Sequence, residues 1–257
     1  MRIMVTGGAG FVGKELVQTL KDGNEVLVAD LLRYGTPDWL SGEPDGFAFE
    51  RVDIRDAAAV AAVVERFAPE VVVHLAAIHY IPECDADPAN AVATNVTGMV
   101  NVLSALAPGT RFVFASSGAV YEPDEAPHRE LESVVKPVDI YGITKDQGED
   151  YVHMFAANRD IAGVIVRLFN VIGPGETNPH LLPAIVVQLR DNPDAISLGN
   201  TWPKRDYIDV QDAAGGFAAA ALGSTPGPGG VEIVNLGSGQ QYSVDDIVDR
   251  MRSVLGL

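Results

Sequence analysis

Short apolar runs alternate with helical patterns along the chain, and this alternation limits the possible folds more than any other feature of the sequence. Most of the runs are continuous, which is typical of strands buried on both faces of a parallel sheet. Helical stretches separate them, for example residues 12–21 and the stretch after Asp56, a candidate N-cap. The pattern predicts an α/β fold with a doubly wound parallel sheet. The expected strands are residues 3–5, 25–30, 47–52, 71–75, 112–114, 161–167 and 231–235.

The pattern changes after Asn170. Proline and glycine interrupt it at residues 173–175 and again at residues 226–230. The length of 257 residues suits a core domain with a small appended lobe. We therefore expect a Rossmann-type domain over residues 1–170. We expect a smaller C-terminal substrate-binding lobe over residues 171–257, interleaved with the core.

The charge balance limits the partners. The chain has 35 acidic and 18 basic side chains and a formal net charge of −17, which repels nucleic acids and anionic membranes. Its single cysteine, Cys84, excludes an intrachain disulfide and a cysteine-based zinc site, and the carboxylates of residues 122–132 lack metal-ligand spacing. No apolar run approaches the ~20 residues that span a bilayer, and the N-terminus is unlike a signal peptide. We expect a cytoplasmic protein without metal, nucleic-acid or membrane partners.

A glycine-rich turn at residues 7–13 follows the first expected strand and opens the first helix. It matches G-x-G-x-x-G from Gly8 or G-x-x-G-x-x-G from Gly7. Such glycines let the backbone approach a pyrophosphate, which then lies at the helix N-terminus. Asp30, 17 residues after the last glycine, ends the second expected strand, where a carboxylate accepts ribose hydroxyls and repels a 2′-phosphate. The segment predicts a dinucleotide site that favours NAD over NADP, although Arg33 nearby counts slightly against that preference.

Three polar residues form a candidate catalytic set. Tyr141 and Lys145 are four residues apart in an expected helix, so both side chains leave the same face. A lysine ammonium beside a phenol is expected to lower the phenol pKa from ~10 toward a working pH, which makes Tyr141 a general base. Ser117 lies at the end of an expected parallel strand, where open α/β sheets bind ligands. The three residues predict proton transfer beside a nicotinamide.

Four further residues are given structural roles. His74 lies on a buried strand and is expected to be a core histidine with its hydrogen bonds made. Cys84 is expected to be an inert thiol. Tyr121 and Trp202 are expected to pack against other side chains, although the Tyr121 hydroxyl could reach the site and Trp202 could instead stack against a sugar.

The motifs together resemble the extended short-chain dehydrogenase/reductase family, in its NAD-dependent nucleotide-sugar epimerase and dehydratase branch. They occur in the order typical of that family along nearly the whole chain. The matching segments are GGAGFVG (residues 7–13), Asp30, residues 52–54, HLAA (74–77), Asn95, SSGAVYE (116–122), YGITK (141–145), RLFNVIGPG (167–175), RDYIDV (205–210) and NLGSG (235–239).

The resemblance implies a role for each matched residue. The catalytic residues would be Ser117, Tyr141 and Lys145. A nucleoside-diphosphate sugar would be bound by Ser117, Asn170 and Arg205. Asn95 would also brace the catalytic loop, and a plain loop role stays open for His79. The NAD-binding residues would be Gly7, Gly10, Phe11, Val12, Gly13, Asp30, Asp53, Ile54, Leu75, Ala76, Ala77, His79, Asn95, Ser116, Tyr141, Lys145 and Phe169.

The function implied is that of an NAD-dependent nucleotide-sugar 4-epimerase, which oxidises C4 of the hexose transiently. Ser117 is followed by Gly118 and Ala119, where the 4,6-dehydratases of the family carry Asp and Glu, so that route of dehydration is disfavoured. A 4-keto-sugar reductase or another dehydratase is the alternative within the family. A non-catalytic NAD-binding regulator is the alternative outside it, because family members usually continue for several tens of residues beyond Leu257. By analogy, we expect a homodimer formed by the helix after Pro88 and the helix that carries Tyr141.

Overall fold

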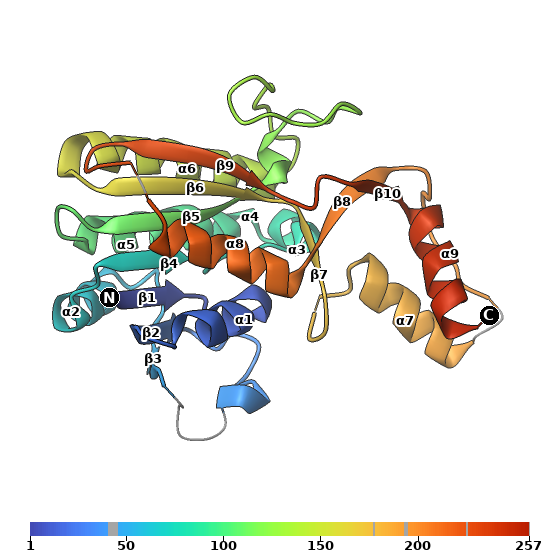
Figure 1. Cartoon of the computed structure of the whole chain (residues 1–257), viewed down its shortest axis with the longest axis horizontal. Helices are drawn as coiled ribbons and strands as arrows, with labels where there is room; N and C mark the ends of the chain where they lie inside the picture. Colours follow the sequence, from blue (N-terminus) through green and yellow to red (C-terminus); the bar gives the residue numbers. More distant parts are fainter. Residues whose placement is uncertain (41–45, 177, 193–194, 225, 257) are drawn as a thin grey trace.

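Seven parallel strands form the central sheet of the computed structural model, in the order β3-β2-β1-β4-β5-β6-β9 (Figure 1). The structure describes residues 1–40, 46–176, 178–192, 195–224 and 226–256, so the last residue of the expected lobe lies outside it. Every expected strand lies in this sheet, and the prediction of a Rossmann-type fold is confirmed. The strands are β1 (Arg2–Thr6), β2 (Glu25–Asp30), β3 (Ala48–Arg51), β4 (Val71–His74), β5 (Arg111–Ser117), β6 (Ala162–Leu168) and β9 (Val231–Leu236).

Helices cover both faces of this sheet because successive side chains of a strand point to opposite faces. In β1, Ile3 and Val5 pack into one apolar core, whereas Met4 packs into the other. The helices over the first core are α1 (Phe11–Leu20) and α8 (Val210–Leu222), and those over the second are α2 (Ala57–Phe67), α5 (Met99–Ala105) and α6 (Ile140–Arg159).

Side-chain caps fix the start of several helices, among them α2 and α9. Asp56 accepts hydrogen bonds from two backbone N–H groups in the first turn of α2, which confirms the predicted N-cap. Ser243 and Asp246 form a reciprocal capping box at the start of α9 (Val244–Leu255). None of the helices in the described ranges combines the length and the apolar character that a bilayer crossing requires.

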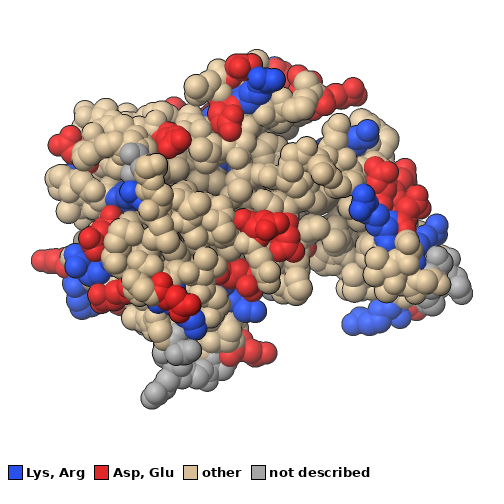
Figure 2. Space-filling model, in the orientation of Figure 1, with Lys and Arg blue, Asp and Glu red and all other residues tan. Residues whose placement is uncertain are grey.

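The chain leaves the large sheet after β6 and builds a lobe at its carboxyl edge (Figure 1). Basic and acidic side chains lie close together on this lobe in Figure 2. The Trp202 side chain is 71% exposed there, so the expectation that it packs is wrong. The lobe contains a second sheet of β10 (Gln241–Ser243), β8 (Lys204–Asp209) and β7 (Asn170–Ile172), together with α7 (Leu181–Asp191) and α9.

Two segments from beyond residue 170 return to the main sheet. Helix α8 packs against α1, and β9 pairs with β6 along its whole length. The chain therefore crosses between sheet and lobe more than once, which ties the lobe to the carboxyl edge where parallel sheets bind ligands.

Two glycines of helix α6 leave no room for a side chain between the helix and the β5 region. A Cβ atom added at Gly148 would lie 2.5 Å from Cζ of Phe114 in β5. A Cβ atom at Gly142 would lie 2.5 Å from the carbonyl oxygen of Ala119, which follows β5. The two glycines therefore set how near the Tyr141 end of α6 comes to the end of β5.

We predict that Gly148→Ala lowers the free energy of unfolding by about 1–3 kcal/mol, because the added methyl group overpacks the core against Phe114. The matched control is Gly215→Ala in α8, where an added Cβ meets nothing within 4 Å. That change should stabilise the protein by roughly 0.5–1 kcal/mol through helix propensity. Urea unfolding of both variants measures the effect, and equal stability of the two would contradict the packing account.

Candidate active site

A large cleft runs along the carboxyl edge of the main sheet and under the lobe. Its volume is about 1750 Å³, which exceeds the roughly 300–1,000 Å³ of ordinary small-molecule sites and leaves room for two ligands side by side. The glycine turn and Asp30 line one half, and Asn170 and Arg205 line the other. All the site residues predicted from the sequence line this cleft except Asn95.

The glycine turn fits a pyrophosphate. Gly7 adopts φ +70°, and a Cβ atom there would lie 2.6 Å from the backbone nitrogen of Ala76. A Cβ at Gly13 would lie 2.6 Å from the carbonyl oxygen of Gly7, so only glycine lets these three segments meet. Helix α1 begins at Gly10 with no side-chain cap and no acidic residue in its first turn. Its N-terminal N–H groups and partial positive charge thus suit an anionic ligand.

Asp30 is held against the glycine turn at the end of β2. One carboxylate oxygen accepts a hydrogen bond from the backbone N–H of Ala9 at 3.1 Å, and the other accepts from Leu32 at 2.7 Å. This position suits the ribose contact that the sequence predicts. Asp53, on the same half of the cleft, is paired with Arg55, whose guanidinium hydrogen bonds hold the pKa of that carboxyl below its usual value.

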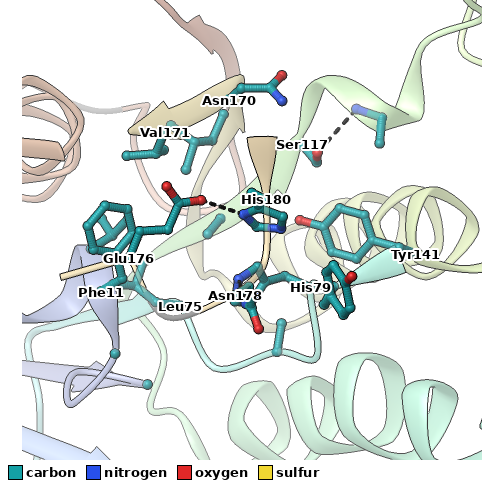
Figure 3. A pocket seen from close by; sticks show the side chains of 18 of the residues that line it. Phe11, Leu75, His79, Ser117, Tyr141, Asn170, Val171, Glu176, Asn178 and His180 are labelled. Carbon is teal, nitrogen blue, oxygen red and sulfur yellow. Dashed lines mark hydrogen bonds and ion pairs between the residues drawn. The ribbon is translucent and has the colours of Figure 1, made fainter. Parts of the chain in front are cut away.

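Tyr141 and Lys145 leave the same face of α6. The Lys145 ammonium nitrogen lies 5.6 Å from the centroid of the Tyr141 ring and donates a hydrogen bond to the carbonyl oxygen of Ala115 at 2.8 Å. Ser117 ends β5 beside them, and its hydroxyl accepts from the backbone N–H of Ala119 at 3.1 Å. Figure 3 shows the side chains of Ser117 and Tyr141 on one wall of the cleft.

Burial controls the pKa values of this set. It raises the pKa of Tyr141 to about 12, against the opposing effect of a hydrogen bond with Ser117. It lowers the pKa of Lys145 to about 8. The expected lowering of the Tyr141 pKa is therefore wrong in this structure, because loss of water around the phenolate dominates and the Lys145 ammonium is held by the Ala115 carbonyl. Tyr141 is a neutral phenol at neutral pH here.

Asn95 lies behind the wall of the cleft and braces it. Its amide oxygen accepts from the backbone N–H of Ile78 at 2.7 Å, and its amide nitrogen donates to the Ile78 carbonyl and to Thr144 Oγ1. The Thr144 hydroxyl in turn donates to the carbonyl oxygen of Tyr141. Asn95 thus joins the loop after β4 to α6 and does not itself line the space expected for NAD. It lies on a π-helical segment (Ala93–Gly98) that connects α4 (Pro88–Val92) to α5.

A buried ion pair that the sequence reading missed supports Ser117. Arg167 in β6 donates to both carboxylate oxygens of Glu149 in α6, at 2.9 and 2.6 Å, and both side chains are buried. Ser116 donates to the same carboxylate at 2.5 Å, and the hydroxyl of Tyr121 accepts from Arg167 at 2.9 Å. The sequence signal that could have revealed this pair is Arg167, a charged residue inside an otherwise apolar strand, because a buried charge requires a buried partner.

A second polar cluster faces Tyr141 across the cleft (Figure 3). The sequence pointed to its His79 but not to Glu176, Asn178 or His180. His180 Nδ1 lies 2.5 Å from a Glu176 carboxylate oxygen, and the Asn178 amide nitrogen lies 2.8 Å from His79 Nε2. The surrounding protein and the charges of His180 and Lys145 hold the pKa of His79 below its ordinary value, so its ring is neutral. Three of the four residues come from the Pro- and Gly-rich stretch between β7 and α7, where the sequence shows no periodic pattern.

His74 is buried as expected, but only one of its ring nitrogens has a partner within the described ranges. Nδ1 lies 2.7 Å from the Thr6 hydroxyl, and Nε2 makes no hydrogen bond. The ring stacks against Phe112 and Phe114, and burial lowers its pKa to about 3. His74 is therefore a neutral core residue under the site. Cys84 is a buried free thiol whose pKa burial raises to about 11, which fits the expected inert role.

The Lys145 pKa makes stability depend on pH. Since the folded value is about 8 and the ordinary value is 10.5, the unfolded chain binds more protons between these limits. The free energy of unfolding should therefore rise as the pH increases from about 8 to about 10. Urea unfolding across this range should show a smaller rise for Lys145→Met than for the native chain. Lys136→Met, at an exposed lysine, should leave the slope unchanged, and equal slopes in all three proteins would contradict the buried, depressed lysine.

Comparison with known proteins agrees with this geometry. The sequence pattern of the NAD dependent epimerase/dehydratase family matches residues 3–237. A UDP-glucose 4-epimerase of Streptomyces lividans is 33% identical, over 99% of this chain and 81% of that protein. A GDP-6-deoxy-D-talose 4-dehydrogenase of Aggregatibacter actinomycetemcomitans is 30% identical over 82% of this chain and 67% of its own length.

A solved structure gives the same result for the fold. The UDP-glucose 4-epimerase of Thermus thermophilus, in complex with NAD, superimposes with a TM-score of 0.84 at 28% identity, covering 100% of this chain and 84% of that one. The match of the family pattern spans the glycine turn, the Ser117, Tyr141 and Lys145 set, and Arg205. The chain therefore belongs to the NAD dependent epimerase/dehydratase family.

Proposed function

We propose that the chain is an NAD-dependent nucleotide-sugar 4-epimerase acting on a UDP-linked hexose. One observation carries the proposal. Ser117 and Tyr141 lie in a single cleft between a half shaped for a dinucleotide and a half lined by Asn170 and Arg205. The relatives named UDP-glucose 4-epimerase support the uridine nucleotide and the reaction at C4.

The residues of the first half fit NAD. The glycine turn would hold the pyrophosphate, Asp30 the adenosine ribose, and Asp53 with Ile54 the adenine. Lys145 would reach the ribose of the nicotinamide half. The chemistry that NAD supplies when bound is the reversible acceptance of a hydride from C4.

The proton at O4 is handled by the chain itself. After losing its own phenolic proton to solvent, Tyr141 would accept the O4 proton through its phenolate oxygen, while Ser117 shares the hydrogen bond to O4. Burial raises the Tyr141 pKa to about 12, so the phenolate needs a nearby cation. Lys145 lies on the same helix face and would supply that charge when its ammonium group leaves the Ala115 carbonyl and turns toward the phenolate. Tyr141 would return the proton to O4 after the keto sugar has turned over in the cleft.

The second half fits a nucleotide sugar. Asn170 in β7 and Arg205 in β8 lie on adjacent parallel strands of the lobe sheet, with Asn170 opposite Tyr207. A guanidinium fork suits the oxygens of a diphosphate. We therefore assign the diphosphate to Arg205 and the hexose to the space between Asn170 and Tyr141, and we propose that residues 171–257 contribute this substrate lobe.

A 4-keto-sugar reductase is the second candidate, because one relative is named a GDP-6-deoxy-D-talose 4-dehydrogenase. Such an enzyme would use the same three residues but release oxidised cofactor in every turnover. Dehydration by the Asp and Glu route is disfavoured, since Gly118 and Ala119 cannot move a proton. A non-catalytic NAD-binding regulator has less support, because it would not need Tyr141 and a buried Lys145 together in the cleft.

We also propose a cytoplasmic homodimer. Helices α4 and α6 pack together and expose apolar side chains, namely Val92, Ile143 and Met154. Ile143 and Met154 are eleven residues apart, so they lie on one face of α6. The buried free thiol of Cys84 is typical of a reducing compartment such as the cytoplasm.

The proposed chemistry predicts that Tyr141→Phe lowers turnover by at least about 100-fold, since it removes the only general base assigned to O4. NAD bound to the purified protein should stay at the native level. Tyr151→Phe on the same helix is the control and should keep full activity. The assay incubates each protein with UDP-, GDP-, dTDP- and CDP-hexoses and follows the product by mass spectrometry and NMR.

The outcomes separate the candidate functions. An isomeric product of unchanged mass without added cofactor supports an epimerase. A two-unit mass change that requires added NAD(P)H supports the reductase, and a loss of about 18 mass units supports a dehydratase. Bound NAD without turnover of any sugar would favour the non-catalytic protein.

The dimer proposal predicts that Met154→Arg converts the protein to a monomer, because it places a charge in the apolar contact between α6 helices. Light scattering coupled to size exclusion measures the mass. Val254→Arg in α9, at a side chain that is 85% exposed, is the control and should leave the mass unchanged. A native protein that elutes as a monomer would refute the dimer.

A further inference from the structure

Arg33 is the only basic residue between Asp30 and Arg51 in the sequence. Glu83 in α3 (Ile81–Ala86) holds its guanidinium group. One carboxylate oxygen of Glu83 forms an ion pair with the guanidinium of Arg33, and the other accepts a hydrogen bond from the Tyr34 hydroxyl at 3.0 Å. We propose that Glu83 is a positioning residue for cofactor selectivity, which keeps Arg33 from a 2′-phosphate and so makes the dinucleotide site reject NADP. This inference rests on the proposed NAD site and deepens it.

The turn after Asp30 places Arg33 where a 2′-phosphate would be recognised. Leu32 adopts φ +57° and donates its N–H to Asp30, and the Gly35 N–H donates to the Leu32 carbonyl at 3.1 Å. This tight turn carries Arg33 and Tyr34 along the lining of the cleft, next to the carboxylate expected on the adenosine ribose. In dinucleotide folds an arginine near that ribose is what accommodates a 2′-phosphate.

Glu83 removes Arg33 from that role. Both of its carboxylate oxygens are used, and its side chain stands outside the lining of the cleft in the part of the chain described. The Arg33 guanidinium also lies 5.6 Å from the centroid of the Tyr34 ring, which holds it further against the turn. Burial and the hydrogen bond to Glu83 raise the pKa of Tyr34, so the phenol keeps its proton and the contact is present at neutral pH.

Two further arginines on this side are also engaged. Arg55 donates to both oxygens of Asp53 and to Asn90, and Arg51 donates to the Leu31 carbonyl. Two acidic residues therefore both disfavour the binding of NADP. Asp30 repels the 2′-phosphate directly, and Glu83 occupies the guanidinium that would otherwise neutralise it.

The test compares the two dinucleotides on intact protein. Native chain and variants are equilibrated with equimolar NAD and NADP, separated from free ligand and denatured, and the released dinucleotides are quantified by mass spectrometry. Glu83→Gln should raise the bound NADP/NAD ratio by about threefold to fivefold, the size expected for one partly exposed ion pair. Adding Arg33→Ala to Glu83→Gln should abolish the gain, since the gain acts through Arg33.

Tyr34→Phe is the matched control, because it removes a hydrogen bond to Glu83 but leaves the ion pair with Arg33. Its ratio should equal that of the native chain. An unchanged ratio for Glu83→Gln, or a raised ratio that persists without Arg33, would overturn the inference while leaving the NAD site intact. A native chain that retains neither dinucleotide would overturn the proposed function as well.

Discussion

The contact between α6 and β5 is the constraint on which the site depends. Tyr141 and Lys145 are on the helix and Ser117 is at the end of the strand, so the set exists only because the two elements touch. Gly148 allows that contact, since any side chain there would meet Phe114. The buried pair of Glu149 and Arg167 then locks α6 to β6, and it binds Ser116 beside Ser117. Close packing and a buried ion pair thus both fix the positions of Ser117, Tyr141 and Lys145.

The fold was predictable because its signals are local. Short apolar runs, most of them continuous, identified the strands of the main sheet, and Asp56 marked a helix start through its side-chain cap. The glycine turn, Asp30 and the Tyr141 and Lys145 spacing were predictable for the same reason, because each is a short pattern with one geometric consequence.

What the sequence could not reveal depends on residues far apart in the chain. The four-residue spacing indicates that Lys145 and Tyr141 share a helix face, but burial of Tyr141 by several elements raises its pKa to about 12. The His180 and Glu176 cluster lies on a segment without regular periodicity, and it reaches Tyr141 only because the chain turns back from β7. The ion pair between Arg33 and Glu83 likewise joins residues 50 positions apart.

The most direct test of the epimerase account is the fate of the hydrogen at C4. A UDP-hexose labelled with deuterium at C4 is incubated with the purified protein without added cofactor, and the product is analysed by NMR and mass spectrometry. The account predicts the C4 epimer with its deuterium retained at C4, because the hydride leaves and returns within one cleft. Loss of the label from C4, or the absence of an epimer with any UDP-hexose, would contradict it.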